Sequence, residues 1–168
     1  MSTPRTRVLM VCLGNICRSP TAEGVLRHLV QKRGLSAQIE VASCGTSGHW
    51  HAGDSADSRT ISHAQRRGYD LSKHRARALT ANDFETFDFL LAMDSNNLSA
   101  MKSICPRAHQ HKLRLLMEFA PKAGSAVVPD PYYDGPEAFE LVLDLCEKGC
   151  DGFLEHLGTR RAPSDPVS

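Results

Sequence analysis

Apolar residues gather in short runs that are separated by turns and by longer amphipathic segments. Residues 8–11 (VLMV) form a run that breaks abruptly into a glycine-containing turn, the profile of a buried strand. Similar runs predict further strands at residues 39–43, 89–93 and 113–117. Helical segments lie between these runs, and such alternation is typical of a parallel sheet with right-handed crossovers. The pattern therefore predicts an α/β fold.

Apolar residues at helical spacing predict the main helices. The first should follow the first strand directly, with Ser19 as its cap, and should end at Gly34. A polar stretch at residues 57–68 predicts a helix before the third strand. The last helix is predicted over residues 138–157, where two internal glycines can bend it.

Length and charge restrict the classes of function. A chain of 168 residues fits one domain around one core. Its 20 lysines and arginines nearly cancel its 19 aspartates and glutamates, so nucleic acid and membrane are not expected as partners. No apolar stretch is long enough to span a bilayer, and the start, MSTPRTRV, lacks the apolar segment of a secretory signal. A cytoplasmic location is expected, with the domain over residues 1–158 and a disordered tail over 159–168.

The six cysteines are expected to be reduced thiols, because a chain of this size is stabilised by burial and shows no secretion signal. No group of cysteines, histidines and carboxylates has a recognisable metal-ligand spacing, so no metal site is expected. Four cysteines are predicted to be small buried residues: Cys44, Cys105, Cys146 and Cys150.

The candidate chemistry lies in residues 12–19 (CLGNICRS), between the first strand and the first helix. The carboxyl end of a strand and the N-terminus of a helix meet there, where unpaired N–H groups and the helix dipole favour an anion such as phosphate. Gly14 allows a tight turn, and the planar fork of Arg18 can bind two phosphate oxygens. The other residues of this phosphate-binding loop are Leu13, Asn15, Ile16, Cys17 and Ser19.

Cys12 would lie beneath the phosphorus as a nucleophile. A thiol must ionise to attack, and the loop dipoles, Arg18 and the Ser19 hydroxyl would all stabilise its thiolate. The alternative, a buried cysteine that ends a strand beside a surface arginine, accounts for fewer of these features together.

Three motifs resemble the low-molecular-weight protein tyrosine phosphatases: VCLGNICRSP near the start, LLAMDSNN in the middle and DPYY at residues 130–133. The resemblance covers residues 8–157 and implies a flavodoxin-like domain, with a four-stranded parallel sheet and helices on both faces. It also implies hydrolysis of phosphotyrosine in proteins and of small aryl phosphates, without metal or cofactor. Inorganic phosphate would be product and inhibitor, and the protein would be a monomer or weak dimer.

The resemblance also assigns roles. Cys12 would attack phosphorus, Arg18 would stabilise the equatorial oxygens, and Asp130 would protonate the leaving oxygen and then activate water. From the residues alone, an Asp-Pro pair such as this one usually just marks a turn.

Supporting roles follow from the same resemblance. Ser43 and His74 occupy the places of a serine and a histidine that form a network with the loop asparagine, here Asn15. Without the resemblance, they would be a strand-end residue and a surface histidine. The phenyl ring of the substrate would lie between aromatic side chains that otherwise suggest core: Trp50, Tyr132 and Tyr133.

Cys17 corresponds to a family cysteine that forms a disulfide with the nucleophile under peroxide. Reversible redox inactivation through Cys12 and Cys17 is therefore a hypothesis, and simple packing of Cys17 under the loop is its alternative.

Two other functions remain open, a protein arginine phosphatase and a noncatalytic phosphotyrosine-binding module. A protein arginine phosphatase has the same scaffold but carries threonine where Ile16 stands here, and a thiol-coupled arsenate reductase would need more cysteines than Cys105 after the third strand. A noncatalytic phosphotyrosine-binding module would need neither Cys12 nor Asp130.

Overall fold

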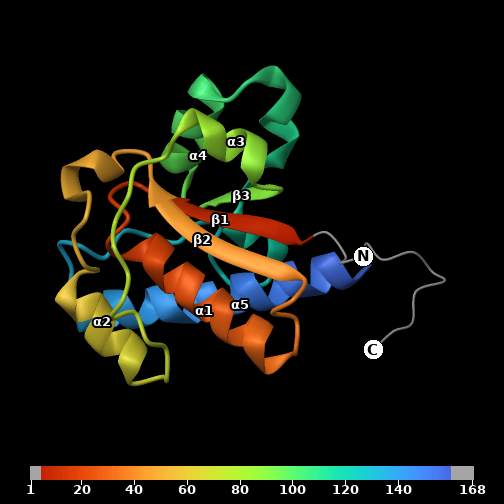
Figure 1. Cartoon of the computed structure of the whole chain (residues 1–168). Helices are drawn as coiled ribbons and strands as arrows, with labels where there is room; N and C mark the ends of the chain where they lie inside the picture. The colour runs from red at the N-terminus through yellow and green to blue at the C-terminus, as the bar shows by residue number, and fades with distance from the viewer. Residues whose placement is uncertain (1–4, 160–168) are drawn as a thin grey trace.

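The computed structural model describes residues 5–159 and contains one parallel four-stranded sheet of order β2-β1-β3-β4 (Figure 1). Its strands are β1 (Thr6–Cys12), β2 (Ile39–Gly45), β3 (Phe89–Ala92) and β4 (Leu113–Leu115). This confirms the predicted α/β fold and the parallel sheet. Because β1 lies at the centre of the sheet, its carboxyl end is flanked by two neighbouring strands.

Helices cover both faces of the sheet, as expected. Figure 1 shows α1 and α5 on one face and α3 and α4 on the other, with α2 packed against α5. The α-helices are α1 (Arg18–Lys32), α2 (Ser58–Gln65), α3 (Ala81–Thr86), α4 (Ser95–Ile104) and α5 (Pro136–Thr159). Three short 3₁₀ helices are η1 (Gly48–His51), η2 (Arg107–Lys112) and η3 (Leu116–Phe119).

Alternating side chains of β1 divide the core in two. Val8 and Met10 pack in a cluster with residues of α1 and α5, whereas Leu9 and Val11 pack with residues of α3 and α4. All four are fully buried. A strand covered on both faces has no polar side to alternate with, which is why its sequence is a continuous apolar run.

Some predicted boundaries were wrong. The fourth strand ends at Leu115 instead of residue 117, because Leu116 and Met117 turn into η3 and bury their side chains there. The helix predicted at residues 57–68 is shorter, and Asp57 caps it by accepting a hydrogen bond from the Arg59 backbone N–H.

The predicted cap of the first helix was also wrong. Helix α1 begins at Arg18, one residue before Ser19, and its N-cap residue, Cys17, makes no side-chain capping bond. The Ser19 hydroxyl cannot serve as a cap because it lies in contact with Cys12 and Asn15. The residue that seemed to begin the helix thus belongs to the loop's polar network.

Helix α5 continues through Gly149 and Gly152, the two glycines at which the sequence allows a bend. A Cβ added to Gly152 would lie 1.9 Å from the Phe119 carbonyl oxygen, and one on Gly149 would lie 2.8 Å from Leu116 Cγ. The two glycines therefore allow α5 to pack closely against η3.

The six cysteines are free and buried, which confirms the prediction for the four outside the loop. The predicted tail at residues 159–168 lies outside the described residues, apart from Thr159, which ends α5. Among the described helices, none is both long and apolar enough to cross a membrane.

Candidate active site

The loop after β1 is held by the segment that follows β2. The carbonyls of Cys12 and Leu13 accept hydrogen bonds from the backbone N–H groups of Thr46 (2.9 Å) and Ser47 (2.8 Å). Gly45 makes this approach possible, because a Cβ there would lie 2.5 Å from the Leu13 carbonyl oxygen. The loop conformation is therefore set by neighbouring backbone.

Asn15 has a left-handed backbone (φ 61°) that its side chain and carbonyl help to hold. Its Oδ1 accepts from the Arg77 backbone N–H (2.9 Å), which fixes the orientation of the amide. Its Nδ2 then donates to Ser19 Oγ (2.8 Å) and Ser43 Oγ (3.0 Å). The Asn15 carbonyl accepts from His74 Nε2 at 2.7 Å. The structure thus brings the predicted Ser43 and His74 into contact with Asn15.

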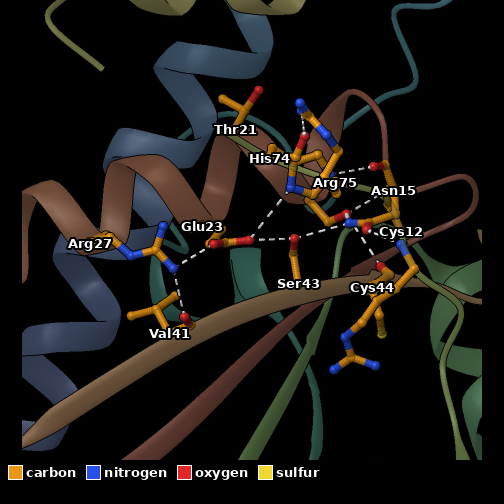
Figure 2. A network of polar contacts seen from close by, with 12 residues as sticks. Cys12, Asn15, Thr21, Glu23, Arg27, Val41, Ser43, Cys44, His74 and Arg75 are labelled. Carbon is orange, nitrogen blue, oxygen red and sulfur yellow. Dashed lines mark hydrogen bonds and ion pairs between the residues drawn. The ribbon is translucent and has the colours of Figure 1, made fainter. Parts of the chain in front are cut away.

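Beyond Ser43 the network continues to α1. Figure 2 shows the Glu23 carboxylate between Arg27 and Ser43: it accepts from Ser43 Oγ (2.5 Å) and from Arg27 Nη2 (2.5 Å). Arg27 Nη2 also donates to the Val41 carbonyl at 2.8 Å. His74 Nδ1 lies 3.9 Å from Glu23. A carboxylate can only accept and a guanidinium can only donate, so these two groups fix the direction of each hydrogen bond in the row.

The direction matters at Cys12. The Ser43 hydroxyl donates a hydrogen bond to Glu23 and accepts one from Asn15, and Asn15 also donates to Ser19. The Ser19 proton is then left for Cys12 Sγ at 2.9 Å or the Cys44 carbonyl at 3.3 Å. An ionised Cys12 would attract that proton, because a hydrogen bond to a charged acceptor is the stronger one.

Arg18 is buried, and its guanidinium is oriented by acceptors on two other segments. Its Nη1 donates to Asp94 Oδ2 (2.6 Å) and to the Val128 carbonyl (3.2 Å). Burial alone would lower the pKa of Arg18, but Cys12, Asp94 and Asp130 outweigh burial and raise it. The guanidinium is therefore charged and held in place before any anion binds.

Asp130 lies near this arginine although the two are far apart in sequence. Asp130 Oδ2 is 4.0 Å from Arg18 Nη2, and 47% of its side chain is exposed. The segment is anchored by the Val128 backbone N–H, which donates to the carbonyl of Met93 at the end of β3 (2.7 Å). A carboxyl group thus faces the cation of the anion-binding loop from the solvent side.

The three predicted aromatic walls are all exposed. Trp50 (66% exposed) belongs to η1. This helix lies against the loop: the His51 ring is so near Gly14 that a Cβ there would be 3.2 Å from His51 Cδ2. Tyr132 (38%) and Tyr133 (95%) follow Asp130, with their rings stacked at 5.0 Å between centroids. None of them belongs to the core.

Cys17 is buried, and burial raises its pKa to about 12. It is therefore a neutral thiol at pH 7, unlike the nucleophile that the loop is suited to stabilise. Within residues 5–159, no group of three or more histidine, cysteine, aspartate or glutamate side chains could hold a metal ion.

Three site residues had no predicted role. Glu23 lies inside the first helix, one position past the place of a capping-box glutamate, and Gly45 is the last residue of β2, where a glycine can signal close backbone approach. Asp94 belonged to a recognised motif. In the structure one of its oxygens binds Arg18 while the other caps α4 through the Asn97 backbone N–H (2.8 Å).

Comparison with known proteins agrees with this geometry. Residues 7–162 match the sequence profile of the family "Low molecular weight phosphotyrosine protein phosphatase". A relative of that name from Schizosaccharomyces pombe is 45% identical over 138 residues, which cover 82% of this chain and 87% of the relative.

Solved structures of the same fold include a protein tyrosine phosphatase from Entamoeba histolytica, with 36% identity and a TM-score of 0.88 over 90% of this chain and 96% of that one. A Drosophila arginine phosphatase matches with 31% identity and a TM-score of 0.84, over 92% of this chain and 99% of that one. The match to the family profile extends over nearly the whole chain. The chain therefore belongs to the low molecular weight phosphotyrosine protein phosphatase family.

Proposed function

We propose that the protein hydrolyses phosphotyrosine in proteins, and small aryl phosphates, through a phosphate ester of Cys12. The observation that carries this proposal is the meeting of three groups from distant segments: the Cys12 thiol beside Ser19, the buried Arg18, and the Asp130 carboxyl 4.0 Å from Arg18. Together they supply a nucleophile, a cation for the phosphoryl oxygens and a proton donor.

In the first step the Cys12 thiolate attacks phosphorus, and the bond from phosphorus to the phenolic oxygen breaks. Arg18 and the loop N–H groups stabilise the charge on the equatorial oxygens, while Asp130 gives its proton to the leaving oxygen. The Ser19 hydroxyl, directed by Asn15, stabilises the sulfur as an anion.

In the second step water attacks the cysteinyl phosphate. Asp130, now a carboxylate, takes the proton from that water, the bond between sulfur and phosphorus breaks, and Cys12 leaves as a thiolate. Inorganic phosphate is released, and because it fits the same cradle, we expect it to inhibit.

The exposed aromatic side chains support an aryl ester as the substrate. Leu13 (42% exposed) and Trp50 lie on the loop side, and Tyr132 directly follows the acid segment, so apolar surface is available for a phenyl ring. A protein arginine phosphatase is the second candidate, since one shares this fold. Ile16 argues against it, because the family resemblance implies a threonine at this position in arginine phosphatases.

The test is phosphate release from three matched peptides that carry phosphotyrosine, phosphoserine or phosphoarginine, with EDTA in excess. Turnover of the phosphotyrosine peptide by the wild type and none by Cys12→Ser supports the proposal. Preferred turnover of phosphoarginine supports the second candidate. Saturable binding of the phosphotyrosine peptide without phosphate release would instead indicate a binding module.

A cytoplasmic location and a monomeric or weakly dimeric state belong to the proposal as well. Cell fractionation and light scattering across a concentration series test them.

A further inference from the structure

The carboxyl group of Asp130 is oriented by the tyrosine that follows it. Asp130 Oδ1 accepts a hydrogen bond from the backbone N–H of Tyr132 at 3.1 Å. The Asp130 side chain is about half exposed, so packing alone does not fix its direction. Whatever holds Tyr132 in place therefore also holds the carboxyl group.

Arg59, in the first turn of α2, contacts the ring of Tyr132. The guanidinium carbon lies 5.4 Å from the Tyr132 ring centroid and 4.6 Å from that of Phe139. Phe139 is buried in the first turn of α5, so one planar cation contacts both a partly exposed ring of the acid segment and a buried ring of the core. Arg59 joins α2 to the segment between Asp130 and α5.

The guanidinium is itself held from the other side by Asp57. Arg59 Nε lies 3.1 Å from Asp57 Oδ1, and Nη2 lies 2.9 Å from Oδ2, which is a two-point pairing of planar groups. The Asp57 side chain is only 12% exposed. The Asp57 backbone N–H donates to the carbonyl of Ile16 in the phosphate-binding loop at 2.9 Å.

These contacts form one continuous path from the phosphate-binding loop to the acid. It runs from Ile16 through Asp57 and Arg59 to the ring of Tyr132, whose N–H binds Asp130. We propose that Arg59 is a positioning residue that sets the Asp130 carboxyl at the height of the leaving oxygen. The inference rests on the proposed function, in which Asp130 is the proton donor.

The size of the effect follows from the exposure of the path. Arg59 is 43% exposed, and a cation over an aromatic ring at such a site shifts an equilibrium about two- to fivefold. With two rings and the pairing to Asp57, we expect loss of the guanidinium to reduce proton donation about five- to tenfold. Loss of the Arg59 guanidinium would misplace the acid without removing it, so we expect a smaller loss of rate than when Asp130 itself is replaced.

The test uses a series of aryl phosphates that differ in the basicity of the leaving phenol. A good leaving group such as p-nitrophenolate hardly needs a proton, whereas unsubstituted phenolate does. For Arg59→Met, we expect kcat/KM to fall about five- to tenfold for phenyl phosphate and less than about twofold for p-nitrophenyl phosphate. If Arg59 had a merely structural role, kcat/KM would fall equally for the two substrates.

Two matched variants complete the experiment. Arg66→Met removes an exposed arginine at the other end of α2 and should leave the whole series unchanged. Asp57→Asn keeps a side chain that can cap α2 and keeps the backbone N–H, but it removes the charge that pairs with Arg59. If both residues act on one path, the double variant Asp57→Asn, Arg59→Met should be no slower than Arg59→Met alone.

Each outcome is decisive when Asp130→Ala is measured beside these variants. An equal loss for all leaving groups in Arg59→Met, or no loss, would overturn the inference if Asp130→Ala still depends steeply on the leaving group. Multiplying losses in the double variant would also overturn the path through Arg59. If Asp130→Ala shows no such dependence, the proton donor has been misassigned, and the inference falls with it.

Discussion

At the scale of single residues, the polar network under the loop has a direction. Arg27 can only donate and Glu23 can only accept hydrogen bonds. Every hydrogen bond in the row through Ser43 and Asn15 therefore has a fixed donor, and Asn15 Nδ2 donates to Ser19. Such a row is useful beneath a nucleophile because it leaves the Ser19 proton free for the sulfur of Cys12.

The direction can be tested with Glu23→Gln, which preserves size but introduces a donor. In the wild type both Arg27 and Ser43 donate to Glu23. Arg27 requires an acceptor, so the new amide would turn its oxygen to Arg27 and its NH₂ group to Ser43, and the Ser43 hydroxyl would lose its acceptor. We expect kcat/KM for p-nitrophenyl phosphate to fall about fivefold, the worth of one disrupted hydrogen bond. Steady-state kinetics measure it.

Glu155→Gln is the matched control, because Glu155 is exposed on α5. It should retain wild-type kinetics. Equal kinetics for both glutamine variants would mean that the direction of the row has no effect on the nucleophile.

Cys17 gives a second residue-scale prediction. Burial raises its pKa to about 12, so peroxide should first oxidise Cys12, and the Cys17 thiol would then resolve the product as a disulfide. After peroxide treatment, dithiothreitol should restore the wild type but restore Cys17→Ser to less than about half of its activity. Equal recovery of the two proteins would count against a protective disulfide.

Residue roles could be predicted from the sequence only where a motif carried them. Cys12 and Arg18 stand together in one short loop, so spacing and chemistry pointed to both. Asp130 and His74 depended on the family resemblance, because nothing local to them shows which distant loop they approach. Arg59 was not predicted at all, since a stacking partner 73 positions away (132 − 59) leaves no trace in a local pattern.

At the scale of elements, close packing of α5 against η3 depends on glycine. By helix propensity alone, replacing Gly152 with alanine would stabilise α5 by about 1 kcal/mol. The Phe119 carbonyl oxygen, however, lies 1.9 Å from the position of that Cβ. Packing and propensity therefore predict opposite signs for the same substitution.

We expect Gly152→Ala to lower the free energy of unfolding by about 1–3 kcal/mol, because overpacking forces α5 away from η3. Gly158→Ala is the control: nothing lies within 4 Å of its Cβ position, so propensity should make it neutral or slightly stabilising. Urea unfolding measures both. A more stable Gly152→Ala would show that α5 is free to shift.

Element types were easier to predict than element ends. The four strands were recognised by their clustered apolar residues, which are continuous in β3 and in the middle of β1 and interrupted by polar residues in β2 and β4. Helix α5 was recognised because its apolar residues recur over many turns. The ends of β4 and α1 were missed since tertiary contacts decide them: burial of Leu116 ends β4, and the loop network takes the hydroxyl of Ser19.

At the scale of the whole molecule, stability should depend on pH through an ion pair in which the aspartate is buried. Asp83 accepts two hydrogen bonds from Arg77 at 3.0 Å each, and its side chain is 7% exposed. Burial alone would raise the pKa of Asp83, but bonds from Arg77 and Thr80 outweigh it, so the folded pKa lies below the ordinary value. The Arg77 backbone in turn binds Asn15.

The sign follows from proton binding. With its folded pKa depressed, Asp83 binds fewer protons in the folded than in the unfolded chain, so its contribution is complete above about pH 5 and disappears as pH falls through the folded pKa. We expect Asp83→Asn to lose about 1–3 kcal/mol at pH 7 and to approach the wild type as the pH falls through the folded pKa of Asp83. Urea unfolding across this pH range measures the gap, and a gap that stays constant would contradict the assignment.

The general architecture was predictable because it depends on features that repeat along the chain. Alternating runs and amphipathic segments suffice for a parallel sheet between helices, and no single residue decides it. The active site depends on which loops meet, which follows from the strand order β2-β1-β3-β4 and the lengths of the crossings. That information appears only when the chain is folded, or through relatives that share the fold.

The central claim is a covalent phosphate on Cys12, and rapid quenching with mass spectrometry tests it most directly. Asp130→Asn should slow the second step, so mixing it with p-nitrophenyl phosphate and quenching in acid should trap one phosphoryl group. Peptide mapping should place it on Cys12, and Cys12→Ser should neither carry the group nor turn over. Phosphate on another residue, or continued hydrolysis with Cys12 unmodified, would contradict the account.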